Sequence, residues 1–211
     1  GGGAKYTSQS RYYYGYNFPE METDSVPSFS DDQVRQRFNI FDVHGEIFNG
    51  VRTEADFDYK AGIALYLMDG NPAVRESGID FTLQATNWIS DKQPFDIKLR
   101  TDFTSYKDTS KQSLNNIYLS PSYTTSIAGR YRLKVGVNLT SSDDDFNVFP
   151  DISLNAPVID GLLSAFIGAE GSLQKNTLRS LAEYNPWVRP RLLIRNSEYT
   201  RFYGGVEGAI S

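Results

Sequence analysis

Apolar and polar residues alternate along much of the chain, from about Asn39 to about Leu139. In the segments 55–67, 95–103 and 131–139, odd-numbered positions are apolar or small and neutral, and the positions between them carry the charges. Successive side chains of a β-strand point to opposite faces of its sheet, so each segment has one apolar face and one charged face. Roughly ten residues is also the length that a tilted strand needs to cross a bilayer.

The pattern predicts a chain built from strands with polar joins and one short helical turn at 178–184. The expected strands cover residues 5–16, 38–48, 52–68, 78–88, 94–106, 115–127, 131–140, 148–156 and 162–173, a short segment 192–196, and a last strand 201–210. Long loops are expected at 19–37, 69–77, 107–114, 141–147 and 174–191. The shorter joins alternate with these, which is typical of outer-membrane barrels, so we place the long loops on the outside.

Two joins carry a register prediction. Odd positions stay apolar on both sides of Asn49-Gly50 and of Ala128-Gly129-Arg130. A two-residue turn would exchange the faces, whereas a three-residue loop keeps them. We therefore expect a three-residue loop at each join, and the second should pair Ile127 with Tyr131.

These elements predict an all-β fold: an antiparallel, up-and-down transmembrane β-barrel in one domain or a fragment of one. In lipid, only helices and closed barrels satisfy every backbone polar group, and no apolar run is long enough for a membrane helix. About ten strands can be counted. The sequence ends at Ala209-Ile210-Ser211 and not on an aromatic residue, so we expect the set of strands to be incomplete.

The two faces give two sets of candidate residues. The expected lipid-facing residues are Phe57, Ile63, Leu65, Phe81, Leu83, Phe95, Ile97, Leu99, Leu133, Val135 and Val137. The expected lumen-facing residues are Asp42, His44, Glu46, Glu54, Asp56, Asp58, Lys60, Asp96, Lys98, Arg100, Asp102, Arg130, Arg132 and Lys134. In an open lumen these charges would set solute preference, and in a plugged lumen they would form structural ion pairs.

Alternation alone leaves a second interpretation open. A soluble β-barrel or sandwich that binds a lipid or glycan also has one apolar face, but that face points inward. The membrane interpretation is favoured because the polar face mixes small residues with charges of both signs. The apolar face also carries Tyr, Ala and Thr beside Leu and Ile, as a lipid-facing band does.

Composition narrows the candidate functions. The 211 residues include no cysteine, which excludes disulfides and thiolate metal sites, and the net charge of −5 disfavours a nucleic-acid partner. No secretory signal opens the chain, so we expect either a removed signal or a start within a larger protein. Tyr and Phe are abundant near the expected strand ends, where amphipathic rings favour a membrane interface.

Catalytic and metal chemistry are not expected. His44, the only histidine, lies between Asp42 and Glu46 on the polar face. Same-face neighbours on one strand do not make a triad, so a hydrolase built on His44 is a minor alternative to a histidine in a charge network. Asp143-Asp144-Asp145 lacks the ligand spacing of a calcium loop. We expect no enzyme activity, no cofactor and no metal.

A family resemblance adds a location. The stretch Lys175–Trp187, followed by Leu192–Asn196 and Tyr203-Gly204-Gly205-Val206-Glu207-Gly208, resembles a segment of TonB-dependent-receptor-like outer-membrane barrels of Bacteroidota. The resemblance covers about a sixth of the chain and implies the bacterial outer membrane. No plug domain and no TonB box is found, so active uptake is not carried over. The expected function is a pore, a transporter component or an assembly partner, with outer-membrane lipids and other outer-membrane or periplasmic proteins as partners.

Overall fold

The computed structural model describes residues 1–12, 34–49, 57–71, 73–89, 93–143, 145–185, 187–188 and 192–208. The elements are β1 (Gly2–Tyr12), β2 (Arg35–Phe48), β3 (Phe57–Gly70), β4 (Val74–Trp88), β5 (Pro94–Lys107), β6 (Lys111–Ile127), β7 (Tyr131–Ser142), β8 (Asp145–Ile159), β9 (Leu163–Asn176), α2 (Leu178–Tyr184) and β10 (Arg195–Gly208). The strands form one ten-stranded sheet in sequence order. Every neighbouring pair is antiparallel, which confirms the all-β, up-and-down prediction.

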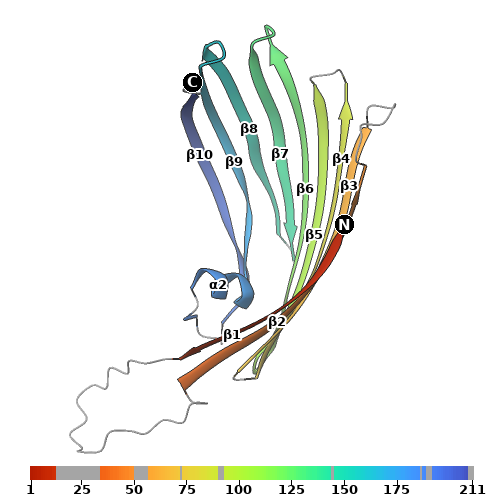
Figure 1. The fold of residues 1–211 in the computed structure, drawn as a ribbon, viewed down its shortest axis with the longest axis vertical. Helices are drawn as coiled ribbons and strands as arrows, with labels where there is room; N and C mark the ends of the chain where they lie inside the picture. The colour runs from red at the N-terminus through yellow and green to blue at the C-terminus, as the bar shows by residue number, and fades with distance from the viewer. Residues whose placement is uncertain are drawn as a thin grey trace, which may run out of the picture.

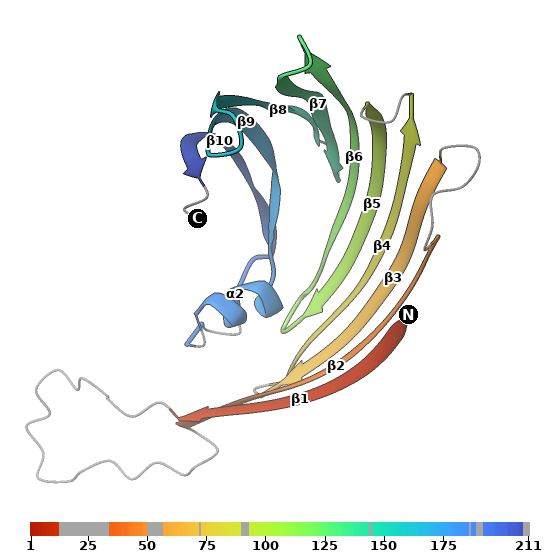
Figure 2. The same cartoon turned by 45° about the horizontal axis from the view of Figure 1, so that its top comes forward.

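The sheet is strongly curved but does not close on itself. In Figure 1 and Figure 2 the strands bend into a trough, and α2 lies on its concave side. Among the described residues β1 pairs only with β2, and β10 pairs only with β9. The prediction of a closed barrel therefore does not hold for these ten strands, because closure requires the two edge strands to pair with each other or with further strands.

Several joins are tighter than the sequence suggested. Gly70 pairs with Val74, Lys107 with Lys111, and Ser142 with Asp145, so the expected long loops at 69–77, 107–114 and 141–147 were wrong. Their polar residues belong to the ends of strands. The joins therefore do not alternate regularly between long and short, and the placement of the long loops on the outside has no support.

The two joins with a register prediction gave different results. Ile127 pairs with Tyr131, which confirms the three-residue loop at 128–130, and within it Ala128 and Gly129 both have positive φ. The first join is wider than predicted, because Phe48 pairs with Lys60. Residues 50–56, including the candidate charges Glu54 and Asp56, lie outside the described residues. The join still keeps even-numbered residues on one face.

The C-terminal part of β9 separates from β8 and, still paired with β10, runs toward α2 on the concave side. β8 pairs with β9 only from Asp151 onward, so residues 145–150 pair with β7 alone. Beyond this point Asn138 Nδ2 donates to the Gly171 oxygen at 2.7 Å. A Cβ at Gly171 would lie 2.9 Å from the Phe149 ring, so only glycine fits where the strand crosses.

An apolar core fills part of the trough at the end where α2 lies. It contains Phe38, Met68, Val74, Tyr106, Leu114, Leu178 and Ile194, all buried. The first five come from the concave face of the sheet, and Leu178 comes from α2. The predicted helical turn at 178–184 is confirmed by α2. Strand β10 is continuous from Arg195 to Gly208, so it joins the end of the expected short segment 192–196 to most of the expected strand 201–210.

Candidate functional site

The concave face is polar along most of its length, and at the α2 end buried polar residues lie beside the apolar core. In β2–β6, each even-numbered residue is paired with an even-numbered residue of the next strand, so these residues share one face of the sheet. Two of them, Asp42 and Glu76, contact α2, which identifies this face as the concave one. Buried polar residues of the concave face are Gln36, Glu76, Asp102, Thr104, Asn116, Ser122, Thr124 and Thr140. Of these, Ser122 and Thr124 lie toward the other end, opposite Asp96 and Lys134. A buried polar group is costly unless it is hydrogen-bonded. The hydrogen bonds of Glu76, Asp102 and Asn116 therefore define the site, whereas the Thr140 hydroxyl has no hydrogen-bond partner among the described residues.

Glu76 on β4 anchors the start of α2 to the sheet. Its side chain is 2 % exposed. The carboxylate accepts hydrogen bonds from the Leu178 amide at 2.7 Å, the Arg179 amide at 3.2 Å and the Tyr66 hydroxyl at 2.9 Å. The first amides of a helix have no partner within the helix, and a carboxylate there is favourable. Thr177 completes the cap by accepting from the Ser180 amide.

A line of alternating charges lies beside this anchor. Lys175 donates to Asp102 at 2.7 Å and to Thr104 Oγ1 at 3.1 Å. Arg100 contacts the other Asp102 oxygen at 3.2 Å and Asp80 at 2.5 Å. Asp102 is almost completely buried, so removing either of its cations would leave a buried charge uncompensated.

Tyr66 links the two clusters. The Arg179 guanidinium lies 4.4 Å from the centre of its ring and 2.6 Å from Asp42. The ring occupies the space above Gly78 on the next strand, where a Cβ would lie 2.1 Å from a ring carbon. Glycine at this position gives Tyr66 the room to reach Glu76. Helix, strand β9 and sheet are thereby joined through polar contacts and ring contacts.

Two groups outside the strands have shifted pKa values. Burial alone would lower the pKa of Arg179, but its contacts with Asp42 and Glu183 outweigh burial and raise it, which keeps the guanidinium charged. In the β5–β6 turn, the Ser110 amide donates to Asp108 at 2.8 Å and lowers the pKa of that carboxyl.

Away from α2 the concave face is more open. It carries ion pairs of Lys134 with Asp151 at 2.6 Å and of Lys60 with Glu46 at 2.7 Å. Lys98 is exposed there. Charges of both signs remain along the trough, but the buried network is confined to the α2 end.

The convex face has the opposite character. Register places apolar side chains opposite one another in rows across β3–β6, for example Ala61, Leu83, Leu99 and Leu119. Many are exposed: Leu83 by 39 %, Ile63 by 48 % and Val135 by 48 %. At the far end, Phe57, Phe95 and Tyr123 share a row. In the part of the chain that the structure describes, α2 and the buried core lie on the other face.

The two predicted sets separate onto these two faces. The register puts Asp42, His44, Glu46, Asp58, Lys60, Asp96, Lys98, Arg100, Asp102, Arg132 and Lys134 on the concave face, and Arg130 in the β7 turn, where it pairs with Asp160 at 3.2 Å. It puts Phe57, Ile63, Leu65, Phe81, Leu83, Phe95, Ile97, Leu99, Leu133, Val135 and Val137 on the convex face. Whether these faces meet lumen and lipid stays a prediction.

His44 offers little for catalysis. Its ring is exposed, and a Cβ at Gly3 would lie 3.1 Å from it. No metal-binding group of His, Asp or Glu side chains occurs among the described residues. Asp144, in the acidic stretch 143–145, lies outside them.

The central residues of the network escaped the sequence analysis. Glu76 and Lys175 fell in segments predicted as loops, Arg179 fell in the predicted helical turn without an assigned role, and Tyr66 was not singled out. Their signal was weak: Glu76 continues the even-numbered polar positions of β4 beyond Gly78, and Thr177 begins a helix cap. The α2 amides that bind Glu76 lie more than 100 residues away along the chain, so local pattern could not reveal them.

Comparisons with known proteins gave no match. No family model, no curated protein and no solved structure is similar enough to report. The resemblance to outer-membrane barrels of Bacteroidota is therefore left as a prediction. Of the helical residues described, no stretch has the length and apolar character to span a membrane.

Proposed function

We propose that this sheet is part of the wall of a bacterial outer-membrane β-barrel that forms a pore or a transporter component. One observation carries the proposal: the same strands expose apolar side chains on the convex face and bury polar ones on the concave face. A water-exposed sheet would place these the other way round, because apolar area leaves water favourably at about 25 cal/mol per Å². Lipid in contact with the convex face would explain why its apolar side chains are not covered by protein.

The width of the apolar band supports the same proposal. Between Phe57 and Leu67 on β3, the convex positions are Phe57, Tyr59, Ala61, Ile63, Leu65 and Leu67, none of them charged. A tilted strand spans the hydrocarbon layer with about 9–11 residues. The row of Phe57, Phe95 and Tyr123 at one end of the band matches the aromatic girdle of such barrels.

The open edges define what the wall still needs. In lipid, unpaired strand edges are not tolerated. The β1 and β10 edges would therefore pair with further strands, supplied by more of the same polypeptide or by another protein. The soluble alternative, a barrel or sandwich that holds a lipid or glycan inside, is disfavoured because the concave face carries the charges.

The interior arrangement favours a pore that is narrowed at one end. α2 and the core around Leu178 fill the trough at that end, while Lys98 and Lys134 line a more open part. Glu76 and Arg179 hold α2 against the wall through side-chain contacts. Weakening these contacts should widen the passage.

Two measurements test this function. The protein should stay with the membrane fraction after an alkaline wash and should need detergent for extraction; recovery in the aqueous fraction would contradict the membrane proposal. In planar bilayers, Glu76→Gln combined with Arg179→Gln should raise the conductance relative to the unaltered protein. Glu198→Gln, which removes an exposed carboxylate on β10 outside this network, is the control. Inserted protein that never conducts, in either form, would remove the pore.

A further inference from the structure

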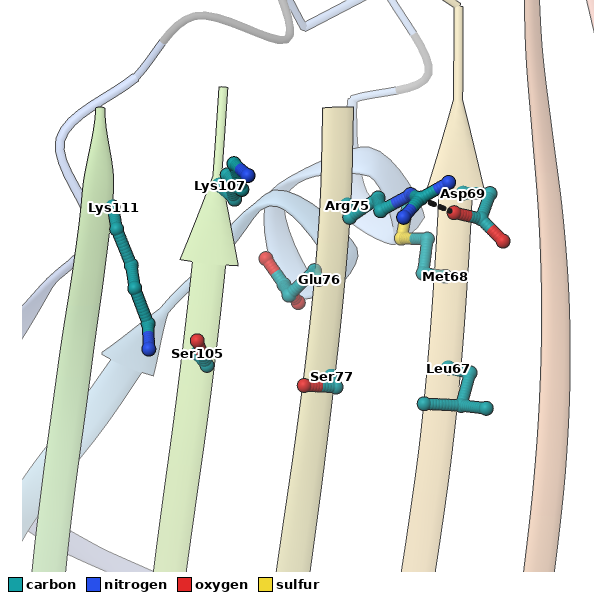
Figure 3. Close-up of a pocket in the computed structure, with 9 residues that line it drawn as sticks. All are labelled: Leu67, Met68, Asp69, Arg75, Glu76, Ser77, Ser105, Lys107 and Lys111. Carbon is teal, nitrogen blue, oxygen red and sulfur yellow. Dashed lines mark ion pairs between the residues drawn. The ribbon is translucent and has the colours of Figure 1, made fainter. Parts of the chain in front are cut away.

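The convex face ends, at the α2 end of the sheet, in a row of charged residues. Asp69, Arg75, Lys107 and Lys111 stand directly opposite one another on β3, β4, β5 and β6. All four are exposed. Figure 3 shows them at one level, with α2 behind the strands. The row therefore lies on the outside of the trough, away from the interior network.

The charges in this row do not balance. Arg75 pairs with Asp69 at 3.1 Å, but within the described part of the chain no carboxylate forms an ion pair with Lys107 or Lys111. The nearby Asp108 carboxylate is used by its own turn, where it accepts from the Ser110 amide and hydroxyl. Like charges directly opposite on neighbouring strands are destabilising, because their Cβ atoms are about 5 Å apart. The two lysines thus favour an anion between them.

Below the cations lies a row of hydroxyl groups. Ser77, Ser105 and Ser113 are paired in register, two residues further along each strand. In Figure 3 the Lys111 side chain runs along the strands toward the level of Ser105. A cavity of about 600 Å³ covers this region, and Leu67 is part of its lining. Cations and hydroxyls therefore face one space.

The apolar band begins in the next row. Leu65, Ile79 and Phe103 are aligned there on the convex face. Passing along the strands, a ligand would meet cations, then hydroxyl donors, then an apolar surface. An anionic phospholipid has the same order: phosphate, polar linkage region and acyl chains. A free anion would use the first row but gain nothing from the third.

We propose that this row is a binding site for the phosphate of a lipid headgroup, with Lys107 and Lys111 on the phosphate oxygens. Ser77 and Ser105 lie where the linkage oxygens fall, and the acyl chains run over Leu67 and Ile79. The proposal rests on the proposed membrane function. It adds the class of lipid that the protein selects and the position at which the headgroup level crosses the sheet.

The test is a lipid titration followed by native mass spectrometry of the detergent-solubilised protein. Phosphatidic acid is the probe, and phosphatidylcholine is the neutral reference lipid. A basic residue near a phosphate-bearing surface changes affinity by about fivefold, so Lys107→Gln and Lys111→Gln should each weaken phosphatidic acid binding by about that factor. The double variant should weaken it by about 25-fold. Lys5→Gln is the control, because it removes the same charge at a different place. Lys5 lies opposite Asp42 in the strand register, on the concave side.

Each other outcome overturns the site. Binding that is unchanged in the double variant, or weakened as much by Lys5→Gln, would place the phosphate elsewhere. Displacement of phosphatidic acid by inorganic phosphate at similar concentrations would make the ligand a soluble anion. These results are distinct from failure of the proposed function, since protein that resists an alkaline wash but ignores phosphatidic acid would lose only the lipid site. The circular dichroism spectrum of each variant shows whether it has folded.

Discussion

The two faces of the same strands differ in both polarity and burial. On β4, Glu76 points to the concave side and is 2 % exposed, whereas Ile79 points to the convex side and is 48 % exposed. The strand backbone is common to both, so the difference lies only in what each face meets. A buried carboxylate is stable because the Tyr66 hydroxyl and the α2 amides hold it. Under the proposed function, lipid covers the exposed isoleucine face.

The largest expected loss of stability comes from placing a charge among the apolar residues of the convex face. Leu83→Arg should reduce the free energy of unfolding in lipid by about 2–4 kcal/mol, because a cation near the bilayer midplane is poorly solvated. Unfolding in lipid vesicles by denaturant titration measures this. Gln84→Arg puts the same side chain on the concave face and should cost far less. Equal, small costs for both would contradict lipid contact, since an exposed surface position tolerates either change.

The concave network is tested by Glu76→Gln. The variant keeps the size of the side chain but loses the carboxylate that accepts from the Leu178 and Arg179 amides, so we expect a loss of about 1–3 kcal/mol. Hydrogen exchange should also speed up at the first amides of α2. Glu183→Gln near the end of the helix removes an exposed carboxylate and should leave these amides protected. Unchanged protection in Glu76→Gln would show that the core around Leu178 holds the helix alone.

A pair of glycines sharpens the contrast between the faces. Gly78→Ala would bring a methyl group onto the Tyr66 ring and should cost about 1–3 kcal/mol through overpacking. Gly45→Ala meets no atom within 4 Å of its new Cβ, so its cost should be much smaller. Thermal unfolding of both variants provides the comparison. A smaller loss for Gly78→Ala than for Gly45→Ala would contradict the packing of Tyr66.

The smallest expected effect is in the β5–β6 turn. The pKa of Asp108 is lowered in the folded protein, so its contribution to stability is complete above the ordinary carboxyl pKa of about 4. The contribution is lost as pH falls through the lowered value. The difference in melting temperature between the unaltered protein and Asp108→Asn should therefore be constant at neutral pH and shrink in strong acid. A difference that grows on acidification would reverse this sign.

The sequence predicted what depends on alternation and little of what depends on distant contacts. Side-chain period placed Leu83, Ile97 and Val135 on one face and Lys98 and Asp102 on the other, and it gave the turn that pairs Ile127 with Tyr131. It misplaced strand ends wherever polar residues continue a concave face, as at Glu76. Closure also could not be read, since pairing of the two edge strands depends on segments far apart in the chain.

The most direct test of the central claim uses adjacent residues on one strand. The sequence contains no cysteine, so Leu83→Cys and Gln84→Cys each introduce a single thiol for a nitroxide spin label. In lipid vesicles, relaxation of the label at residue 83 should respond mainly to dissolved oxygen, which concentrates in lipid. Relaxation at residue 84 should respond mainly to a water-soluble nickel complex. The reverse assignment, or strong nickel accessibility at both residues, would contradict a lipid-facing convex surface.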